Sequence, residues 1–399
     1  MAVETKVECQ VGLTGNSAVA YAMKQINPEV VAAYPITPST GVIEEFSSYV
    51  ADGKVDTELI TVESEHSAMS ACVGSSSAGV RVITTTSSQG LALMWEMLYI
   101  ASGMRLPIVL ACVNRALSAP INIHCDHSDS MGARDSGWIQ LYSETVQEAY
   151  DNMIQAVRIA EHPDVLLPVM VCMDGFITSH AIDNLCLLDD SEVRDFIGEY
   201  RPKHSLLDID NPITYGAFVL SDNYIEIKRQ QSEAMVRARG VVAEVDRDFG
   251  SRFGREYGLV ESYRMDDADV AIMILSSASG TTRVAVDEMR KSGKKVGLVR
   301  PRVFRPFPYV EMQDALKGVQ ALAVLDRVDS MSSFGGPLFV ETRSALYGAK
   351  EAPLVIGRIF GLGGRDYKVD NAIEVYKHLL EIKDTGRVEK LVDYITVRE

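Results

Sequence analysis

The chain has no pair of cysteines spaced C-x-x-C, although its 399 residues include six cysteines. Such pairs are typical of ferredoxin-type iron–sulfur clusters and of zinc knuckles, so we expect this chain to carry neither. Cys72, Cys112 and Cys172 lie in apolar runs, where cysteine usually serves as a small core residue. The spacing and the surroundings therefore favour structural cysteines.

A long hydrophobic run is also missing. No segment approaches the ~20 consecutive apolar residues that a membrane span requires. Residues 1–6 lack the basic start of a secretory signal, and no apolar run follows them. These absences predict a cytoplasmic protein with no membrane partner.

Positive charge is scarce in this chain. The 39 Lys and Arg residues are outnumbered by 55 Asp and Glu residues, which leaves a net charge of −16. Because an acidic protein is repelled by a phosphate backbone, we expect no nucleic acid partner. A local arginine can still bind a small anionic ligand, and the acidic surface can serve solubility alone.

The length and the hydrophobic content of 47% predict a globular α/β protein with two domains. Residues 1–190 alternate short apolar strands with helical stretches, which is typical of a parallel sheet wrapped by helices. Strands are expected at 30–34, 80–84, 108–113 and 165–171, and helices at 65–78, 89–103 and 144–160. Residues 118–138 lack apolar periodicity and are expected to form a long loop, which in compact domains is usually functional or disordered.

The rest of the chain changes in composition. Residues 191–265 are polar and are expected to form a connector that contains a bridging helix at 224–248. A second α/β domain is expected at 266–385, followed by a C-terminal tail at 386–399. Its expected strands are 269–275, 295–300, 321–326 and 354–360, and its expected helices are 281–292, 337–347 and 370–383.

Residues 34–39, with the sequence YPITPS, directly follow the expected strand at 30–34. Two prolines hold this backbone extended and stiff. Ligands bind beyond the carboxyl ends of strands in open α/β sheets, so Thr37 is placed to offer a hydroxyl to a ligand. The alternative is a rigid turn in which Thr37 or Ser39 caps the next helix.

Two acids, Glu63 and Glu65, stand at the start of the expected helix at 65–78, which is rich in Ala, Ser and Gly. They can serve as caps that favour a helix N-terminus, or one of them can address a ligand that the small residues allow to approach. Residues two apart point in different directions, so at most one acid is expected to face a ligand. Residues 85–90 (TTSSQG) also open a helix, where they can bind a polar ligand edge or cap the helix.

Arg115 follows the expected buried strand at 108–113. An arginine there is costly to leave unpaired, so it should meet a carboxylate. That carboxylate can come from a substrate or from Glu63 or Asp126. Residues 124–129 (HCDHSD) have the chemistry of a zinc or iron site, but they lie in a loop with no distant fourth ligand, so we expect no metal there.

Taken together, these segments stand in the order and spacing of one family. The set closely resembles the alpha subunit of multisubunit pyruvate:ferredoxin oxidoreductases, which are 2-oxoacid:ferredoxin oxidoreductases, over essentially the whole chain. The segments that carry the resemblance are 34–38 (YPITP), 62–68 (VESEHSA), 86–90 (TSSQG), 114–118 (NRALS), 126–129 (DHSD) and 134–138 (RDSGW). The resemblance implies a pyrimidine-type thiamine-diphosphate-binding domain at 1–190. It also implies a transketolase C-terminal-like domain at 266–385, which holds residues 326–328 (DRV) and 361–366 (GLGGRD).

The resemblance also implies roles for single residues. Glu65 matches the glutamate that hydrogen-bonds N1′ of the thiamine diphosphate pyrimidine, which makes it the expected catalytic residue. Thr37 and Arg115 match substrate contacts, and Arg115 would pair with the pyruvate carboxylate. The further expected cofactor contacts are Pro35, Ser88 and Gln89.

What the chain lacks relative to thiamine enzymes implies partners. It has no Gly-Asp-Gly segment followed by an asparagine, the pattern that holds Mg²⁺ and the diphosphate. The resemblance therefore implies a beta-type subunit for the diphosphate and Mg²⁺, and gamma- and delta-type subunits, with [4Fe-4S] clusters in the partners. Coenzyme A would be the co-substrate and ferredoxin the electron acceptor. The implied reaction converts pyruvate and coenzyme A to acetyl-CoA and CO₂.

Two alternatives stay open at this point. The substrate can be another 2-oxoacid, branched-chain or 2-oxoglutarate, since pocket volume cannot be deduced from the sequence. The chain can also be a non-catalytic scaffold subunit, although a scaffold has no use for Glu65, Thr37 and Arg115 together. The sequence departs from the expected family pattern at residues 124–125, directly before Asp126.

Overall fold

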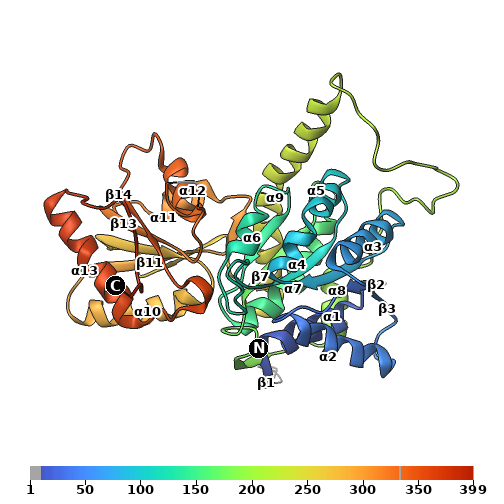
Figure 1. Ribbon diagram of the computed structural model, residues 1–399, viewed down its shortest axis with the longest axis horizontal. Helices are drawn as coiled ribbons and strands as arrows, with labels where there is room; N and C mark the ends of the chain where they lie inside the picture. Colours follow the sequence, from blue (N-terminus) through green and yellow to red (C-terminus); the bar gives the residue numbers. More distant parts are fainter. Residues whose placement is uncertain (1–9, 332–333, 399) are drawn as a thin grey trace, which may run out of the picture.

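The computed structural model describes residues 10–331 and 334–398. Residues 1–9, which include Cys9 and the start on which the prediction about a secretory signal rests, lie outside the described residues. Two α/β halves lie side by side, each built on its own sheet (Figure 1). We call residues 10–253 the first half and the described residues after them the second half.

The first half is built on a sheet with the strand order β12-β6-β7-β5-β4-β2-β3. Its described strands run parallel except for β12 at the edge, which is antiparallel to β6. The strands are β2 (Val30–Ala33), β3 (Glu58–Thr61), β4 (Val82–Thr86), β5 (Val109–Asn114), β6 (Ile139–Tyr142), β7 (Val169–Asp174) and β12 (Val303–Arg305). The predicted parallel sheet is confirmed. A separate antiparallel pair is formed by β1 (Gln10–Thr14) and β8 (Ile182–Cys186).

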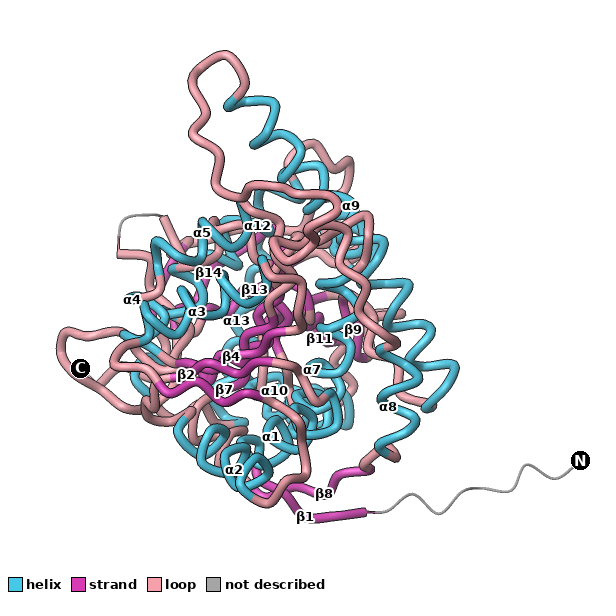
Figure 2. The backbone as a smooth tube through the Cα atoms, turned by 90° about the vertical axis from the view of Figure 1, so that its right-hand side faces the viewer, coloured by secondary structure: helices cyan, strands magenta, loops and turns pink. Residues whose placement is uncertain are grey.

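Helices cover both faces of this sheet (Figure 2). Successive strand residues point to opposite faces, so Ala111 belongs to a core with α1, α2 and α7, and Cys112 to a core with α3 and α5. The helices are α1 (Gly15–Ile26), α2 (Thr40–Ala51), α3 (Glu65–Ser77), α4 (Ser88–Leu93), α5 (Trp95–Gly103), α6 (Ser128–Gly132), α7 (Val146–Glu161), α8 (Asp190–Ile197) and α9 (Tyr224–Phe253). The buried Cys72, Cys112 and Cys172 are free thiols in the core, as predicted.

Some element boundaries differ from the prediction. The strand predicted at 165–171 begins only at Val169, because the residues before it form a turn in which Val165 and Leu166 donate backbone hydrogen bonds to His162. Leu166 also has a positive φ of 44°, which a strand does not allow. The helix predicted at 89–103 is interrupted at Met94 into α4 and α5.

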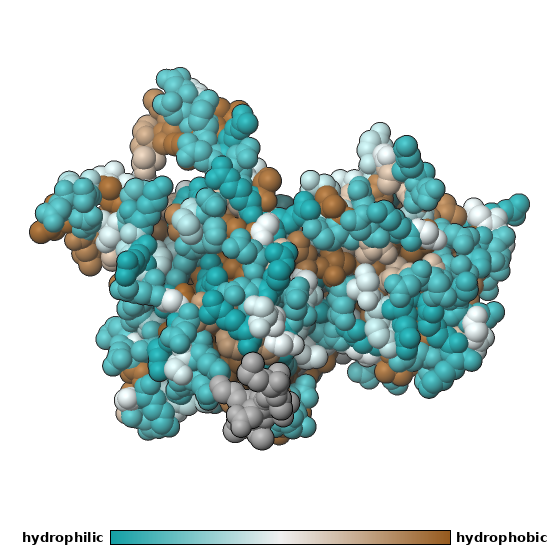
Figure 3. All heavy atoms as spheres, turned by 180° about the vertical axis from the view of Figure 1, so that it is seen from behind, coloured by the Kyte–Doolittle hydropathy of each residue, from teal (hydrophilic) through white to brown (hydrophobic). Residues whose placement is uncertain are grey.

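The helix predicted at 224–248 is α9, which extends to Phe253. It packs on the helices α7 and α5 through small and apolar residues at helical spacing, whereas its first turns project from the body with the loop before them (Figure 1). We call residues 199–227 the arm. Hydrophobic atoms show on the arm in Figure 3. Its exposed apolar side chains are Leu206, Leu207, Ile209, Phe218, Leu220, Tyr224, Ile225 and Ile227. No helix among the described residues is long and apolar enough to cross a membrane.

The second half is built on a sheet with the order β15-β14-β13-β10-β11-β9, parallel except for β9. Its strands are β9 (Val260–Tyr263), β10 (Val270–Ile274), β11 (Val296–Pro301), β13 (Ala321–Asp326), β14 (Leu354–Ile359) and β15 (Val392–Tyr394). Its helices are α10 (Ala278–Lys291), α11 (Tyr309–Ala315), α12 (Pro337–Leu346), the short 3₁₀ helix η1 (Leu362–Gly364) and α13 (Val369–Thr385). Strand β9 falls in the stretch expected as connector and β15 in the stretch expected as tail. Both pair with this sheet.

The two halves interlock through a strand and a set of buried ion pairs. β12 comes from the second half but pairs with β6 of the first sheet. Just before it, the buried Arg300 binds Glu148 of α7 at 3.0 Å, Glu144 at 3.1 Å and Glu261 of β9 at 2.8 Å. A guanidinium that meets three carboxylates in the interior fixes α7 against the second sheet.

Arg300→Met is expected to lower the free energy of unfolding by about 3–5 kcal/mol, because it leaves the buried Glu148 carboxylate without its cation. Denaturant unfolding of the assembled protein, followed by far-UV circular dichroism, measures this loss. Arg387→Met is the matched control, since Arg387 is exposed and has no ion pair among the described residues. A loss in the control as large as in Arg300→Met would contradict the assignment.

Candidate active site

The candidate site forms at one edge of the first sheet, where its parallel strands end. Residues 34–38 follow β2, residues 87–90 follow β4 and residues 115–118 follow β5. Carboxyl ends of parallel strands meet at the same edge, which is where α/β sheets bind ligands. The segments singled out in the sequence therefore share one edge of the fold.

Glu65 is the first residue of α3 and is only 6% exposed. The preceding Ser64 caps the helix, since its side chain accepts from the backbone N–H of Ser67. The Glu65 side chain lies against Gly90 in α4: a Cβ on Gly90 would be 2.6 Å from Glu65 Oε1 and would also collide with Thr86 Oγ1. Glycine at position 90 is thus what leaves room for this carboxylate.

Polar atoms around Glu65 lack partners. Within residues 10–331 and 334–398, no residue hydrogen-bonds the Glu65 carboxylate, and the hydroxyls of Thr86 and Ser87 are buried without a partner. Buried polar groups are almost always hydrogen-bonded, so such a group of unpaired atoms needs an explanation. A polar ligand that completes these bonds supplies one.

Glu63 points elsewhere, as the spacing of the two acids predicts. Its side chain is exposed and accepts a hydrogen bond from the Ser67 hydroxyl, which lowers the pKa of the Glu63 carboxyl. Glu63 thus serves the first turn of α3 and does not enter the interior. Glu65 is the acid that faces the candidate site.

Arg115 is held by backbone carbonyls. Its Nε donates to Asn122 O at 2.8 Å and its Nη1 to Thr37 O at 3.0 Å. The alternative of a structural ion pair with Glu63 or Asp126 is wrong for the described residues, where Arg115 forms none. Arg115 is only 6% exposed. Its remaining nitrogen, Nη2, has no protein partner in the described parts of the chain. Arg115 therefore keeps one donor for a ligand.

Thr37 lies on the exposed loop after β2, and Pro35 is exposed beside it. Asn16 fixes this loop by donating to Pro38 O at 2.9 Å. Ser39 does not cap α2 with its side chain, as the alternative interpretation proposed, but donates back to Ile36 O at 2.8 Å. The Thr37 hydroxyl is left without a hydrogen bond to any described residue.

Ser88 and Gln89 connect the loop after β4 to the loop after β5. Ser88 has a positive φ of 46°, and its Oγ lies 2.5 Å from both Gln89 Oε1 and Ala116 O. Gln89 Nε2 donates to the Ser118 hydroxyl. The two loops are thus held together, and the side chain of Ser88 turns toward Ala116.

Asp129 in α6 is a residue whose role the sequence did not predict. Its carboxylate accepts from the backbone N–H of Ser88 and Arg115, each at 2.9 Å, from Asn114 Nδ2 at 2.8 Å and from the N–H of Ser130 at 2.7 Å. Burial raises the pKa of Asp129 to about 6, although these hydrogen bonds oppose the rise. Asp129 stood within a motif of the family set, which is the signal that could have pointed to it.

The residues at 124–129 do not converge as one metal site. His124 packs on the Phe176 ring at 5.1 Å, whereas Cys125 and His127 approach Asp174 at the end of β7. His127 Nε2 lies 2.8 Å from Asp174 Oδ1, and Arg327 Nη1 lies 2.8 Å from Asp174 Oδ2 and 3.8 Å from Cys125 Sγ. Because the guanidinium already supplies positive charge to this cluster, a cation would be repelled from it.

The second half supports the site through its GLGG turn at 361–364. Asn122, whose carbonyl holds Arg115, donates through Nδ2 to Gly363 O at 3.0 Å. Gly364 donates to Cys125 O at 2.8 Å, and a Cβ on Gly364 would collide with His124. The positive φ values of these glycines show a tight turn that packs directly on the loop below it.

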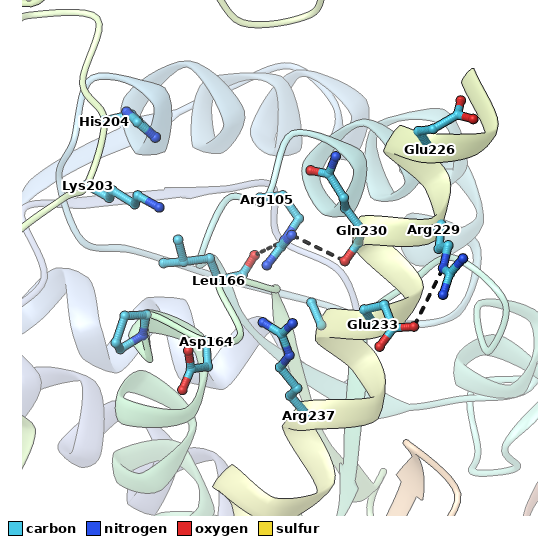
Figure 4. A pocket seen from close by; sticks show the side chains of 12 residues that line it. Arg105, Asp164, Leu166, Lys203, His204, Glu226, Arg229, Gln230, Glu233 and Arg237 are labelled. Atoms are coloured by element: carbon cyan, nitrogen blue, oxygen red, sulfur yellow. Dashed lines mark hydrogen bonds and ion pairs between the residues drawn. The ribbon is translucent and has the colours of Figure 1, made fainter. Parts of the chain in front are cut away.

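A cavity of about 510 Å³ lies away from these residues (Figure 4). It is lined by residues that precede β5 and β7, such as Arg105 and Asp164, and by the α9 side chains Arg229, Glu233 and Arg237. Residues that precede parallel strands stand at the opposite sheet edge from Glu65 and Arg115. None of the predicted site residues lines it, so the cavity and the candidate site are separate places.

Comparison with known proteins identifies the family. Residues 21–247 match the family described as pyruvate flavodoxin/ferredoxin oxidoreductase, thiamine diphosphate-binding. Residues 268–372 match the pyruvate:ferredoxin oxidoreductase core domain II. The chain belongs to the pyruvate flavodoxin/ferredoxin oxidoreductase family.

Similar curated proteins carry more specific names. Pyruvate synthase subunit PorA of Thermotoga maritima is 52% identical over 92% of this chain and 94% of its own length. Pyruvate synthase subunit PorA of Methanocaldococcus jannaschii is 50% identical over 96% and 97%. Ketoisovalerate oxidoreductase subunit VorA of Pyrococcus abyssi is 42% identical over 96% of both chains.

Solved structures share the fold at low identity. The 2-oxoglutarate:ferredoxin oxidoreductase from Magnetococcus marinus, with 2-oxoglutarate, coenzyme A and succinyl-CoA bound, superposes with a TM-score of 0.74 at 19% identity. It covers 95% of this chain and 67% of its own. A split-gene transketolase, an inactive beta4 tetramer, superposes with a TM-score of 0.54 at 12% identity, over 94% and 100% of the two chains. The predicted relation to thiamine enzymes in both halves is therefore confirmed at the level of fold.

Gly90→Ala is expected to weaken thiamine diphosphate binding at least ~10-fold, because the added methyl group displaces the Glu65 carboxylate. The cofactor dissociation constant of the assembled protein, from tryptophan fluorescence or calorimetry, measures the effect. Gly74→Ala is the matched control, since a Cβ there meets no atom within 4 Å. Equal affinities of the Gly90→Ala variant and the unmodified protein would contradict the placement of Glu65 at the cofactor.

Proposed function

We propose that this chain is the alpha-type subunit of a pyruvate:ferredoxin oxidoreductase. The complex would convert pyruvate, coenzyme A and two oxidised ferredoxins to acetyl-CoA, CO₂, a proton and two reduced ferredoxins. High identity to proteins named pyruvate synthase subunit, over nearly the whole chain, supports this reaction. The cytoplasmic location stays a prediction from the sequence.

The observation that carries the proposal is Glu65, a residue only 6% exposed whose carboxylate has no hydrogen bond to any described residue. Thiamine diphosphate offers a polar pyrimidine edge that fits this carboxylate and the unpaired hydroxyls of Thr86 and Ser87. Bound there, the cofactor supplies a nucleophilic carbon and an electron sink. Glu65 would hold a proton at pyrimidine N1′, and glycine at position 90 leaves room for the Glu65 carboxylate. Pro35, Ser88 and Gln89 stay predicted cofactor contacts from the loops on either side.

Arg115 and Thr37 are suited to bind the substrate. The free Nη2 of Arg115 can pair with the pyruvate carboxylate, and this charge-assisted bond would orient the 2-oxo group. Since Nη1 is bound to Thr37 O, the guanidinium also fixes the loop that presents the Thr37 hydroxyl. That hydroxyl can then donate to a substrate oxygen.

The rest of the active site would come from partner subunits. The missing Gly-Asp-Gly and C-x-x-C patterns support a beta-type subunit that holds Mg²⁺ and the diphosphate, gamma- and delta-type subunits, and [4Fe-4S] clusters in the partners. Exposed apolar side chains on the segments of the candidate site also support a partner chain there. These are Tyr34, Leu93, Trp95, Ile121, Ile123 and Ile177.

A branched-chain 2-oxoacid is the second candidate substrate. The 42% identity to a protein named ketoisovalerate oxidoreductase subunit favours it as the alternative. The scaffold alternative is disfavoured by the unpaired donors and acceptors on Glu65, Arg115 and Thr37, because a scaffold has no ligand to complete them.

Glu65→Gln is expected to lower coenzyme A-dependent ferredoxin reduction by pyruvate at least ~10²-fold, since an amide cannot share a proton with N1′. Arg115→Ala is expected to raise the KM for pyruvate while the KM for coenzyme A stays the same. Both are measured anaerobically on the purified complex, with pyruvate, 2-ketoisovalerate and 2-oxoglutarate compared as substrates.

Glu63→Gln is the matched control for Glu65→Gln, because Glu63 is exposed at the same helix start, and it should retain turnover. Full turnover in Glu65→Gln would refute the catalytic role. A higher kcat/KM for 2-ketoisovalerate than for pyruvate would refute the choice of substrate.

A further inference from the structure

One oxygen of Asp129 joins the two loops of the candidate site. Oδ2 accepts the backbone N–H of Ser88, which follows β4, and the backbone N–H of Arg115, which follows β5. Oδ1 accepts from Asn114 Nδ2 and from the N–H of Ser130. A carboxylate has about four acceptor positions, so this residue, 3% exposed, has its acceptor capacity filled by protein donors.

The two N–H groups that donate to Oδ2 belong to residues whose backbone must be held in place. Ser88 has a positive φ, which is unfavourable for a non-glycine residue and persists only where the surroundings hold it. Arg115 must place its guanidinium between Asn122 O and Thr37 O while Nη2 stays free. A shift of either N–H would move Gln89 or the guanidinium relative to the edge where Glu65 stands.

We propose that Asp129 is the positioning residue of this active site, and that its Oδ2 sets the distance between the Ser88–Gln89 loop and Arg115. The inference rests on the proposed role of Arg115 in substrate binding. Asp129 does not touch the substrate; it acts through the backbone of the two residues it anchors. Misplacement of a substrate-orienting group by ~1 Å can lower turnover ~10²-fold.

Asp129→Asn tests this directly. The amide keeps the shape of the side chain but turns an NH₂ group toward two of the four N–H donors. We expect kcat/KM for pyruvate to fall ~10²-fold in the purified complex, with the KM for coenzyme A unchanged. Hydrogen exchange followed by mass spectrometry should show lost protection at the amides of Ser88 and Arg115, while the strands before them stay protected.

Asp151→Asn is the matched control. Asp151 is also fully buried, but it binds Arg255 and Tyr257, which follow α9 and belong to none of the site loops. We expect this variant to lose stability and to retain the wild-type kcat/KM. Equal losses of kcat/KM in both variants would show a merely structural role for Asp129 and overturn the proposal.

The wild-type complex gives a test that needs no substitution. Burial raises the pKa of Asp129 to about 6, so below that pH a proton removes acceptor capacity while the four donors remain. Asn114, Ser88 and Ser130 cannot titrate in this range, and the pKa values of the facing Cys112 and Tyr142 lie well above their usual range. We expect kcat/KM for pyruvate to fall below pH ~6, together with exchange protection at Ser88 and Arg115 after correction for intrinsic rates.

The two proposals fail in different ways. If Arg115→Ala leaves the KM for pyruvate unchanged, the proposed role of Arg115 in substrate binding is wrong. If Arg115→Ala raises that KM while Asp129→Asn keeps the wild-type kcat/KM, the role of Arg115 in substrate binding is supported and the positioning role of Asp129 is wrong.

Discussion

The buried carboxylate of Asp174 is the interaction on which the arrangement of both halves depends. It stands at the end of strand β7 and binds His127 of the loop after β5 and Arg327 and Ser277 of the second half. Burial raises the pKa of Asp174, but Arg327 and His127 outweigh burial and hold it below its usual range. Asp174 therefore stays charged at neutral pH. Its charge fixes His127, which lies in the same loop as Asn122, the residue whose carbonyl holds Arg115.

A further chain of contacts makes Arg115 in the first half depend on a glycine turn in the second. Gly363 holds Asn122, Asn122 holds Arg115, and Arg115 holds the loop of Thr37. Each link is a hydrogen bond to backbone, which fixes position without consuming the donors that a ligand needs. Among the described residues, the hydroxyls of Thr86 and Ser87 are left without a partner at the sheet edge where α3 begins with Glu65.

The sequence predicted the elements whose signals are local. Apolar runs placed β5 and β10 within a residue or two, and the helix that opens at Glu65 was placed because the small residues along it are a local feature. The start of β7 was missed because Leu166 adopts a positive φ, which a leucine in a sequence does not indicate. The partners of Arg115 and the role of Asp129 were missed for one reason: both involve backbone N–H and C=O groups, which every residue has. Only the folded chain shows which of them meet.

Strand β12 has a consequence for how this protein can be divided. It is a piece of the second half that completes the first sheet, so a fragment cut before it would leave β6 with unpaired N–H and C=O groups at an open edge. Open sheet edges pair with other chains and promote aggregation. The two halves therefore share one cooperative structure, and a gene fusion or fission in this lineage would have to keep β12 attached to the sheet that it protects.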